Sequence, residues 1–190
     1  MYRPGHLGIW LLLYAPIALA LFAADRPALA TLGGAIVFMI EPIPDRDQRM
    51  PFLKHRGFSH TIGFAILVGT VLGVLGWFIG DRAFVLIGEW LTGNGYSEIG
   101  SEVVSSRSAV DESFFAMFGF ATGTLAILAH LVGDVLTPMG IRPFWPFSSR
   151  SFSLSLTTAK NPVANGLLLL AGVAAAVGVF WLSFQTGTPP

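Results

Sequence analysis

The chain lacks cysteine entirely, and charged residues make up only 12% of its 190 residues. Without thiols it has no disulfide, no thiolate metal site and no cysteine nucleophile, so histidine, carboxylate, carbonyl or water would have to hold any metal ion. The 11 basic and 11 acidic residues give a formal net charge of zero. No bulk charge therefore attracts nucleic acid, and no nucleic-acid partner is expected.

Apolar residues take the place of the missing charge and make up 53% of the chain. About 20 apolar residues are needed to cross the hydrocarbon core of a bilayer as a helix. We expect a single membrane-embedded, all-α domain over residues 1–190, with the lipid bilayer as its main partner. The expected polytopic bundle has about five transmembrane helices, at 7–24, 27–40, 61–80, 114–133 and 166–184.

Two segments leave alternatives open. The run 27–40 is short, so it either crosses the membrane or forms a re-entrant helix. The segment 81–113 is polar and rich in glycine and serine. We expect it to be a long connection whose residues 84–91 form a short interfacial helix.

Five crossings place all four histidines at one membrane face, at the ends of three helices. Three aspartates share that face, and the resulting set is His6, Asp45, Asp47, His55, His60, His130 and Asp134. Of the 11 basic residues, only Arg26, Arg82 and Arg107 fall on the opposite face. The positive-inside rule therefore predicts a cytoplasmic (inner) membrane protein with this face and the N-terminus in the cytoplasm.

These seven side chains are candidate metal ligands. His130 and Asp134 are spaced i, i+4 on one helix face, where they form either a metal-binding pair or a hydrogen-bonded packing pair. Asp45 and Asp47 are ligands, a ligand and a general base, or parts of a solvated loop. The set suffices for up to two divalent ions about 3.5–4 Å apart. Zinc is the expected metal, with manganese and iron as alternatives.

Arg56 lies between His55 and His60, in the sequence "HRGFSH". Its planar guanidinium suits an oxyanion, so we expect it to bind substrate and to stabilise charge that develops during the reaction. The alternative is that it only anchors the cytoplasmic face. Ser59 more simply caps the next helix.

The motifs resemble those of the YdjM-like (DUF457) family, whose members are regarded as membrane-bound, metal-dependent hydrolases. The matching stretches are "GH" (5–6), "PDRD" (44–47), "HRGFSH" (55–60), "HLVGDVLTPMG" (130–140) and "WP" (145–146). The order of the histidines and aspartates is also similar to that of zinc phospholipases C. The resemblance implies a metal-activated water acting on a lipid-like phosphoester, in a pocket shaped by Thr137 and Trp145.

The sequence departs from the family pattern at two places. Relatives often carry a histidine directly after "PDxD", and this chain has Gln48 there. Relatives also carry Gly-Asn followed by a glutamate near the last span, whereas the corresponding "KNPVANG" (160–166) has no glutamate. Glu41 is an additional carboxylate that could substitute. Three functions therefore compete: a hydrolase, a metal-binding or metal-transporting protein, and a catalytically degenerate scaffold. Ligands at helix ends, rather than near the bilayer midplane, favour the hydrolase over a transporter.

Overall fold

The computed structural model describes residues 1–49, 56–107 and 110–185. Within these ranges the chain is all-α, and its β pairing is limited to one isolated bridge between Ile141 and Phe152. The helices are α1 (Arg3–Ala23), α2 (Pro27–Ile40), η1 (Pro44–Arg49), η2 (Phe58–His60), α3 (Ile62–Gly93), α4 (Ser97–Arg107), α5 (Glu112–Val135) and α6 (Pro162–Gln185).

The five predicted spans are confirmed as five helices long and apolar enough to cross a membrane. They cover Arg3–Ala23, Pro27–Gln48, Ile62–Gly93, Glu112–Val135 and Pro162–Gln185. The second reaches this length only because η1 continues the path of α2, which has 14 residues by itself. The chain is therefore a polytopic, all-α membrane protein.

Local sequence signals fix several helix starts. Proline opens α2 and α6, where its missing N–H costs no helical hydrogen bond. The predicted Ser59 cap of α3 is wrong, because the Thr61 hydroxyl caps this helix by accepting a hydrogen bond from the Phe64 N–H at 3.0 Å. The Asp111 carboxylate caps α5 in the same way, with the Phe114 N–H at 2.8 Å. These caps satisfy N–H groups that would otherwise lack partners at helix ends.

The predicted end of the third span at residue 80 is wrong, and so is the separate helix at 84–91. Helix α3 continues without a break to Gly93, and its 32 residues correspond to about 48 Å. The extra turns are stabilised by packing, because Phe84 is buried beside Phe115 and Gly88 lies against α4 at Gly100. The polar segment 81–113 therefore continues α3 and forms α4, instead of a long loop.

Close backbone approach joins the helices in pairs. A Cβ added to Gly8 of α1 would lie 2.1 Å from the Leu168 carbonyl oxygen of α6. A Cβ added to Gly119 of α5 would lie 2.4 Å from the Leu72 carbonyl oxygen of α3. Small residues at such contacts let membrane helices pack tightly.

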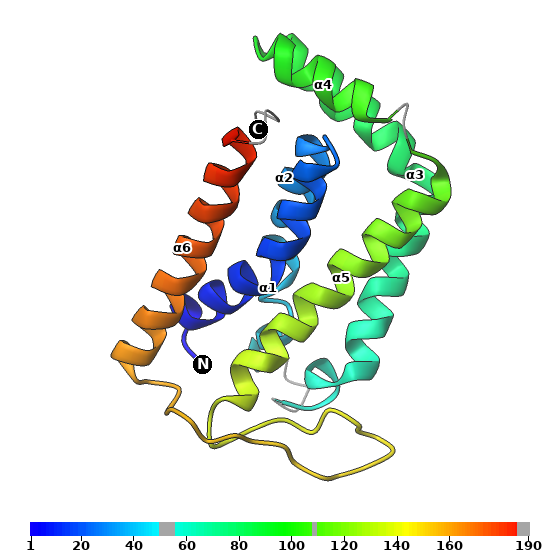
Figure 1. Cartoon of the computed structure of the whole chain (residues 1–190). Helices are drawn as coiled ribbons and strands as arrows, with labels where there is room; N and C mark the ends of the chain where they lie inside the picture. The colour runs from blue at the N-terminus through cyan, green and yellow to red at the C-terminus, as the bar shows by residue number, and fades with distance from the viewer. Residues whose placement is uncertain (50–55, 108–109, 186–190) are drawn as a thin grey trace.

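The two helix pairs bring four helix ends together, as Figure 1 shows at the bottom of the view. The N-terminal ends of α1 and α3 lie there with the C-terminal end of α5 and the chain that follows α2. The loop between α5 and α6 runs beneath them, whereas α4 lies at the opposite end. This arrangement places most of the predicted ligands at one end of the bundle.

Candidate metal centre

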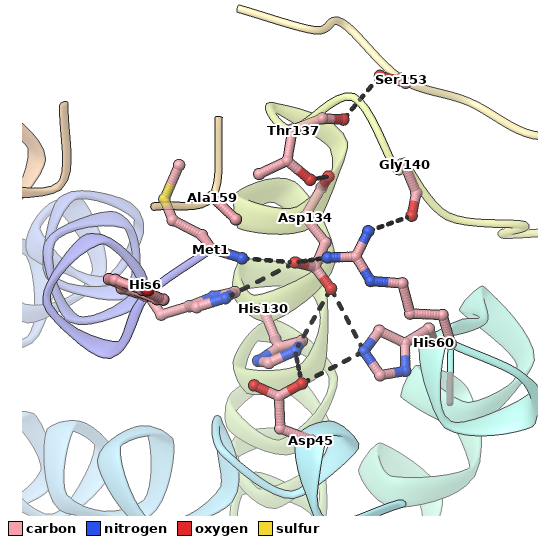
Figure 2. Close-up of polar contacts among 12 residues, drawn as sticks. Met1, His6, Asp45, His60, His130, Asp134, Thr137, Gly140, Ser153 and Ala159 are labelled. Atoms are coloured by element: carbon pink, nitrogen blue, oxygen red, sulfur yellow. Dashed lines mark hydrogen bonds and ion pairs between the residues drawn. The ribbon is translucent and has the colours of Figure 1, made fainter. Parts of the chain in front are cut away.

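Four side chains converge where these helix ends meet (Figure 2). Asp45 comes from η1, His60 from η2, and His130 and Asp134 from α5. His60 Nε2 lies 3.3 Å from Asp134 Oδ2 and 3.8 Å from Asp45 Oδ1. His130 Nε2 lies 3.8 Å and 3.7 Å from the same two oxygens.

These distances fit one tetrahedral metal ion. Ligand atoms bound to zinc at about 2.0–2.2 Å lie about 3.3–3.6 Å from one another in a tetrahedron. The four distances of 3.3–3.8 Å are close to these values. His130 Nε2 and Asp134 Oδ2 are also buried without a hydrogen-bond partner among the described residues. A divalent cation between them would satisfy both atoms, so the donor set fits a metal ion.

Both histidines are held through their other ring nitrogen. His130 Nδ1 lies 3.0 Å from Glu41 Oε1. His60 Nδ1 lies 3.0 Å from the Ser59 hydroxyl and 3.4 Å from Asp47 Oδ2. Such partners fix the tautomer and orientation of metal-binding histidines. Each Nε2 is therefore directed to the centre of the cluster.

Asp134 is held by arginine on its other oxygen. Arg56 donates from one terminal nitrogen to Asp134 Oδ1 at 2.7 Å and from the other to the Gly140 carbonyl oxygen at 2.8 Å. The Met1 amino nitrogen lies 2.9 Å from the same carboxylate oxygen. Arg56 itself adopts a positive φ of 57°, and its backbone N–H donates to Asp47 at 3.1 Å. These contacts leave Asp134 Oδ2 facing the two histidines.

Glu41 is the functional candidate that the ligand prediction left out. Its side chain is buried at the end of α2, and one oxygen, Oε1, faces His130 Nδ1 and His6 Nδ1, the latter at 3.2 Å. The rings of His6 and His130 stack with centroids 4.2 Å apart. Glu41, His6 and His130 also form a possible ligand group. Glu41 lies only three residues before the "PDRD" motif. This proximity is the sequence signal that could have added Glu41 to the predicted site.

A cavity of about 330 Å³ opens beside the cluster. Asp45 lines it and is the most exposed of the four central side chains, at 40%, whereas His60, His130 and Asp134 are at most 2% exposed. Asp45 is also fixed by the Gln48 amide, which donates to Oδ1 at 3.0 Å. His60, His130 and Asp134 are thus buried, and the cluster is open to the cavity at Asp45.

Burial alone would lower the pKa of His60. The neighbouring carboxylates of Asp134 and Asp45 outweigh that effect and hold its pKa above the ordinary value. In the metal-free protein the two carboxylates therefore favour the protonated form of His60. A bound cation would replace that proton, because a histidine ligand must be neutral.

The structure thus gathers His6, Asp45, His60, His130 and Asp134 into one cluster, with Asp47 and Arg56 directly behind it. His55 lies outside the described residues. The Thr137 hydroxyl donates to the Asp134 carbonyl oxygen at 2.8 Å. Trp145 is 44% exposed in the loop after α5. The roles predicted for Asp47, Arg56, Thr137 and Trp145 in catalysis or binding stay predictions.

The fold and site define a polytopic, all-α membrane protein with a histidine–carboxylate cluster at one end of its helices, suited to a metal ion. Residues 5–187 match the family described as YdjM inner membrane protein, so the chain belongs to that family. Comparisons with curated proteins and with solved structures found no match.

Proposed function

We propose that this protein is a membrane-bound, metal-dependent hydrolase that acts on a lipid-like phosphoester. The observation that carries the proposal is the convergence of three buried ligand atoms, with Asp134 Oδ2 3.3 Å from His60 Nε2 and 3.8 Å from His130 Nε2, beside the Asp45 carboxylate, which is open to a cavity. Catalytic metal sites typically have three protein ligands and one open position, whereas structural sites are closed.

In this proposal His60, His130 and Asp134 hold one divalent ion, with zinc as the first candidate and manganese and iron as alternatives. A bound ion would lower the pKa of water and polarise the oxygen of an electrophile. Asp45, at the open side, accepts the proton of the attacking water. The supporting contacts of Glu41 and Arg56 keep the ligands in place.

The second ion of the two-ion alternative would use the group of His6, Glu41 and His130. That arrangement requires His130 to give its Nδ1 atom to one ion and its Nε2 atom to the other. A neutral imidazole has only one free nitrogen lone pair. The geometry therefore favours one ion, with Glu41 as the partner that orients His130.

The lipid-like substrate is supported by position. The cluster lies at the ends of helices that are long enough to span a membrane, and lipid headgroups are expected at such helix ends. The excess of basic residues on this side of the predicted topology supports a cytoplasmic location for the site.

The test uses the purified protein in detergent or liposomes, loaded with zinc, manganese or iron, and follows product release from phosphoester lipids. His130→Ala should lose both metal and activity. Asp45→Asn should retain metal and lose most of the activity, because an amide cannot accept the proton. Asp111→Asn, which changes a carboxylate at the opposite end of α5, is the control.

The outcomes separate the competing functions. Equal product release by the wild type and His130→Ala would refute the hydrolase. One bound ion per chain without turnover of any phosphoester would favour a metal-binding or metal-transport protein. Well under one ion per chain would favour a degenerate scaffold.

A further inference from the structure

The cavity beside the metal centre is lined by two arginines as well as by the cluster. Its lining residues are Arg3, His6, Glu41, Pro42, Asp45, Arg46 and His130. A volume of about 330 Å³ is at the lower end of the range for small-ligand pockets, which is about 300–1,000 Å³. A ligand in this cavity would therefore lie beside the open side of the metal centre and beside both arginines.

Neither Arg3 nor Arg46 forms an ion pair with any residue in the described parts of the chain. Nearby carboxylates are already engaged, because Glu41 faces two histidines and Asp134 is bonded to Arg56. Asp45 accepts from Gln48 and faces the histidines. Both arginines are exposed, and the carboxylates of the cavity already face histidines or Gln48, so an anionic ligand in the cavity would supply the charged partner that the arginines lack.

Arg56 is less available for this task. Its two terminal nitrogens are bonded to Asp134 and to the Gly140 carbonyl oxygen, and its side chain is 13% exposed. An anion could recruit Arg56 only at the expense of contacts that orient Asp134.

We propose that Arg3 and Arg46 are the substrate-recognition residues of this site and bind the phosphate group of the phosphoester. The inference rests on the proposed hydrolase and names the group that its cavity selects. Arginine suits this purpose because its planar fork can donate two parallel hydrogen bonds to phosphate oxygens. The N-terminus of α1, which begins at Arg3, adds a favourable helix dipole for an anion.

The test measures binding of two probes to the full chain in a non-ionic detergent, before and after loading with zinc. Inorganic phosphate is the first probe, and dioctanoyl phosphatidate is the second. Isothermal titration calorimetry compares the wild type with Arg3→Gln, Arg46→Gln and the double variant. Arg142→Gln, an exposed arginine in the loop after α5, is the matched control.

Each single substitution should weaken binding about tenfold, because it removes a charge-assisted contact. The double variant should lose more, and Arg142→Gln should bind like the wild type. A loss seen with both probes identifies phosphate itself as sufficient. A loss seen only with phosphatidate identifies a lipid headgroup. Both results support the arginine pair.

Two results would overturn it: a wild type that binds neither probe, or a double variant that binds as tightly as the wild type. Metal content and activity are measured in parallel. They show whether the arginine hypothesis fails by itself or together with the proposed hydrolase function. The arginine variants should keep the wild-type metal content, because no hydrogen bond or ion pair joins either arginine to His60, His130 or Asp134. If the wild type is metal-loaded and active, and the double variant still binds the probes normally, the proposed role of Arg3 and Arg46 is refuted while the hydrolase function stands.

Discussion

Glu41→Gln tests whether the carboxylate at the end of α2 supports the metal centre. The substitution keeps the size of the side chain and one acceptor oxygen, and it removes the negative charge. Glu41 Oε1 receives two contacts, from His130 Nδ1 at 3.0 Å and from His6 Nδ1 at 3.2 Å. It is buried, so water does not screen the change.

The expected magnitude follows from the contact with His130. A hydrogen bond to a charged group contributes about 1.5–3 kcal/mol, and a neutral one about 1 kcal/mol. The contact with His6 is present with and without metal and does not change metal affinity, so only the contact with the ligand His130 counts. Losing the charge there costs about 1–2 kcal/mol, which corresponds to about 5–30-fold weaker metal binding and overlaps the 10–100-fold range typical for residues that orient metal-binding histidines.

The assay titrates metal-free protein with zinc in competition with a chromophoric chelator. Glu112→Gln, a surface carboxylate at the opposite end of α5, is the matched control and should bind zinc like the wild type. Unfolding of each variant is followed by circular dichroism to show that the helices form. Wild-type zinc affinity in a folded Glu41→Gln protein would refute the role assigned to Glu41.

Three further predictions follow from named contacts. Arg56→Lys should weaken metal binding about 10–100-fold in the same chelator assay, because lysine cannot make both guanidinium contacts at once; unchanged binding would contradict that role. Gly8→Ala should lower the free energy of unfolding by about 1–3 kcal/mol in detergent melts, whereas Gly166→Ala, with open space at its Cβ, should be neutral or stabilising. In the cysteine-free chain, a thiol at Ser149→Cys should react with an impermeant maleimide only from the cytoplasmic side, and one at Ser97→Cys only from the opposite side; labelling of both from one side would refute the topology.

The helical architecture was predictable because hydrocarbon imposes a simple rule on the chain. Every span has to be a long apolar helix, so composition and run length located all five. The far end of α3 was missed because charges at Asp81 and Arg82 suggested that the span ended there. Charged residues predict where a span leaves the hydrocarbon, but they do not end a helix. The helix itself continues because α4 and α5 offer it packing partners at Phe84 and Gly88.

The gathering of histidines and aspartates at one end was also predictable, since helix direction alternates at each span. Their individual roles were not. Asp45 and Asp47 are two residues apart on η1, and a 3₁₀ helix has three residues per turn, so their side chains point in different directions. Asp45 faces His60 and His130, whereas Asp47 lies behind His60 and bonds to Ser59. Sequence spacing alone could not assign these directions.

Glu41 illustrates the same limit over a longer distance. It pairs with His130, 89 residues away in the chain, through packing of α2 against α5. With Glu41 and Arg56 in place, most charged groups of the cluster face an opposite charge, yet His130 Nε2 and Asp134 Oδ2 are buried without a hydrogen-bond partner among the described residues. Buried polar atoms left unpaired are costly in a membrane protein. Two of them, facing each other at 3.8 Å beside His60 and Asp45, are explained most economically by a cation that binds between them.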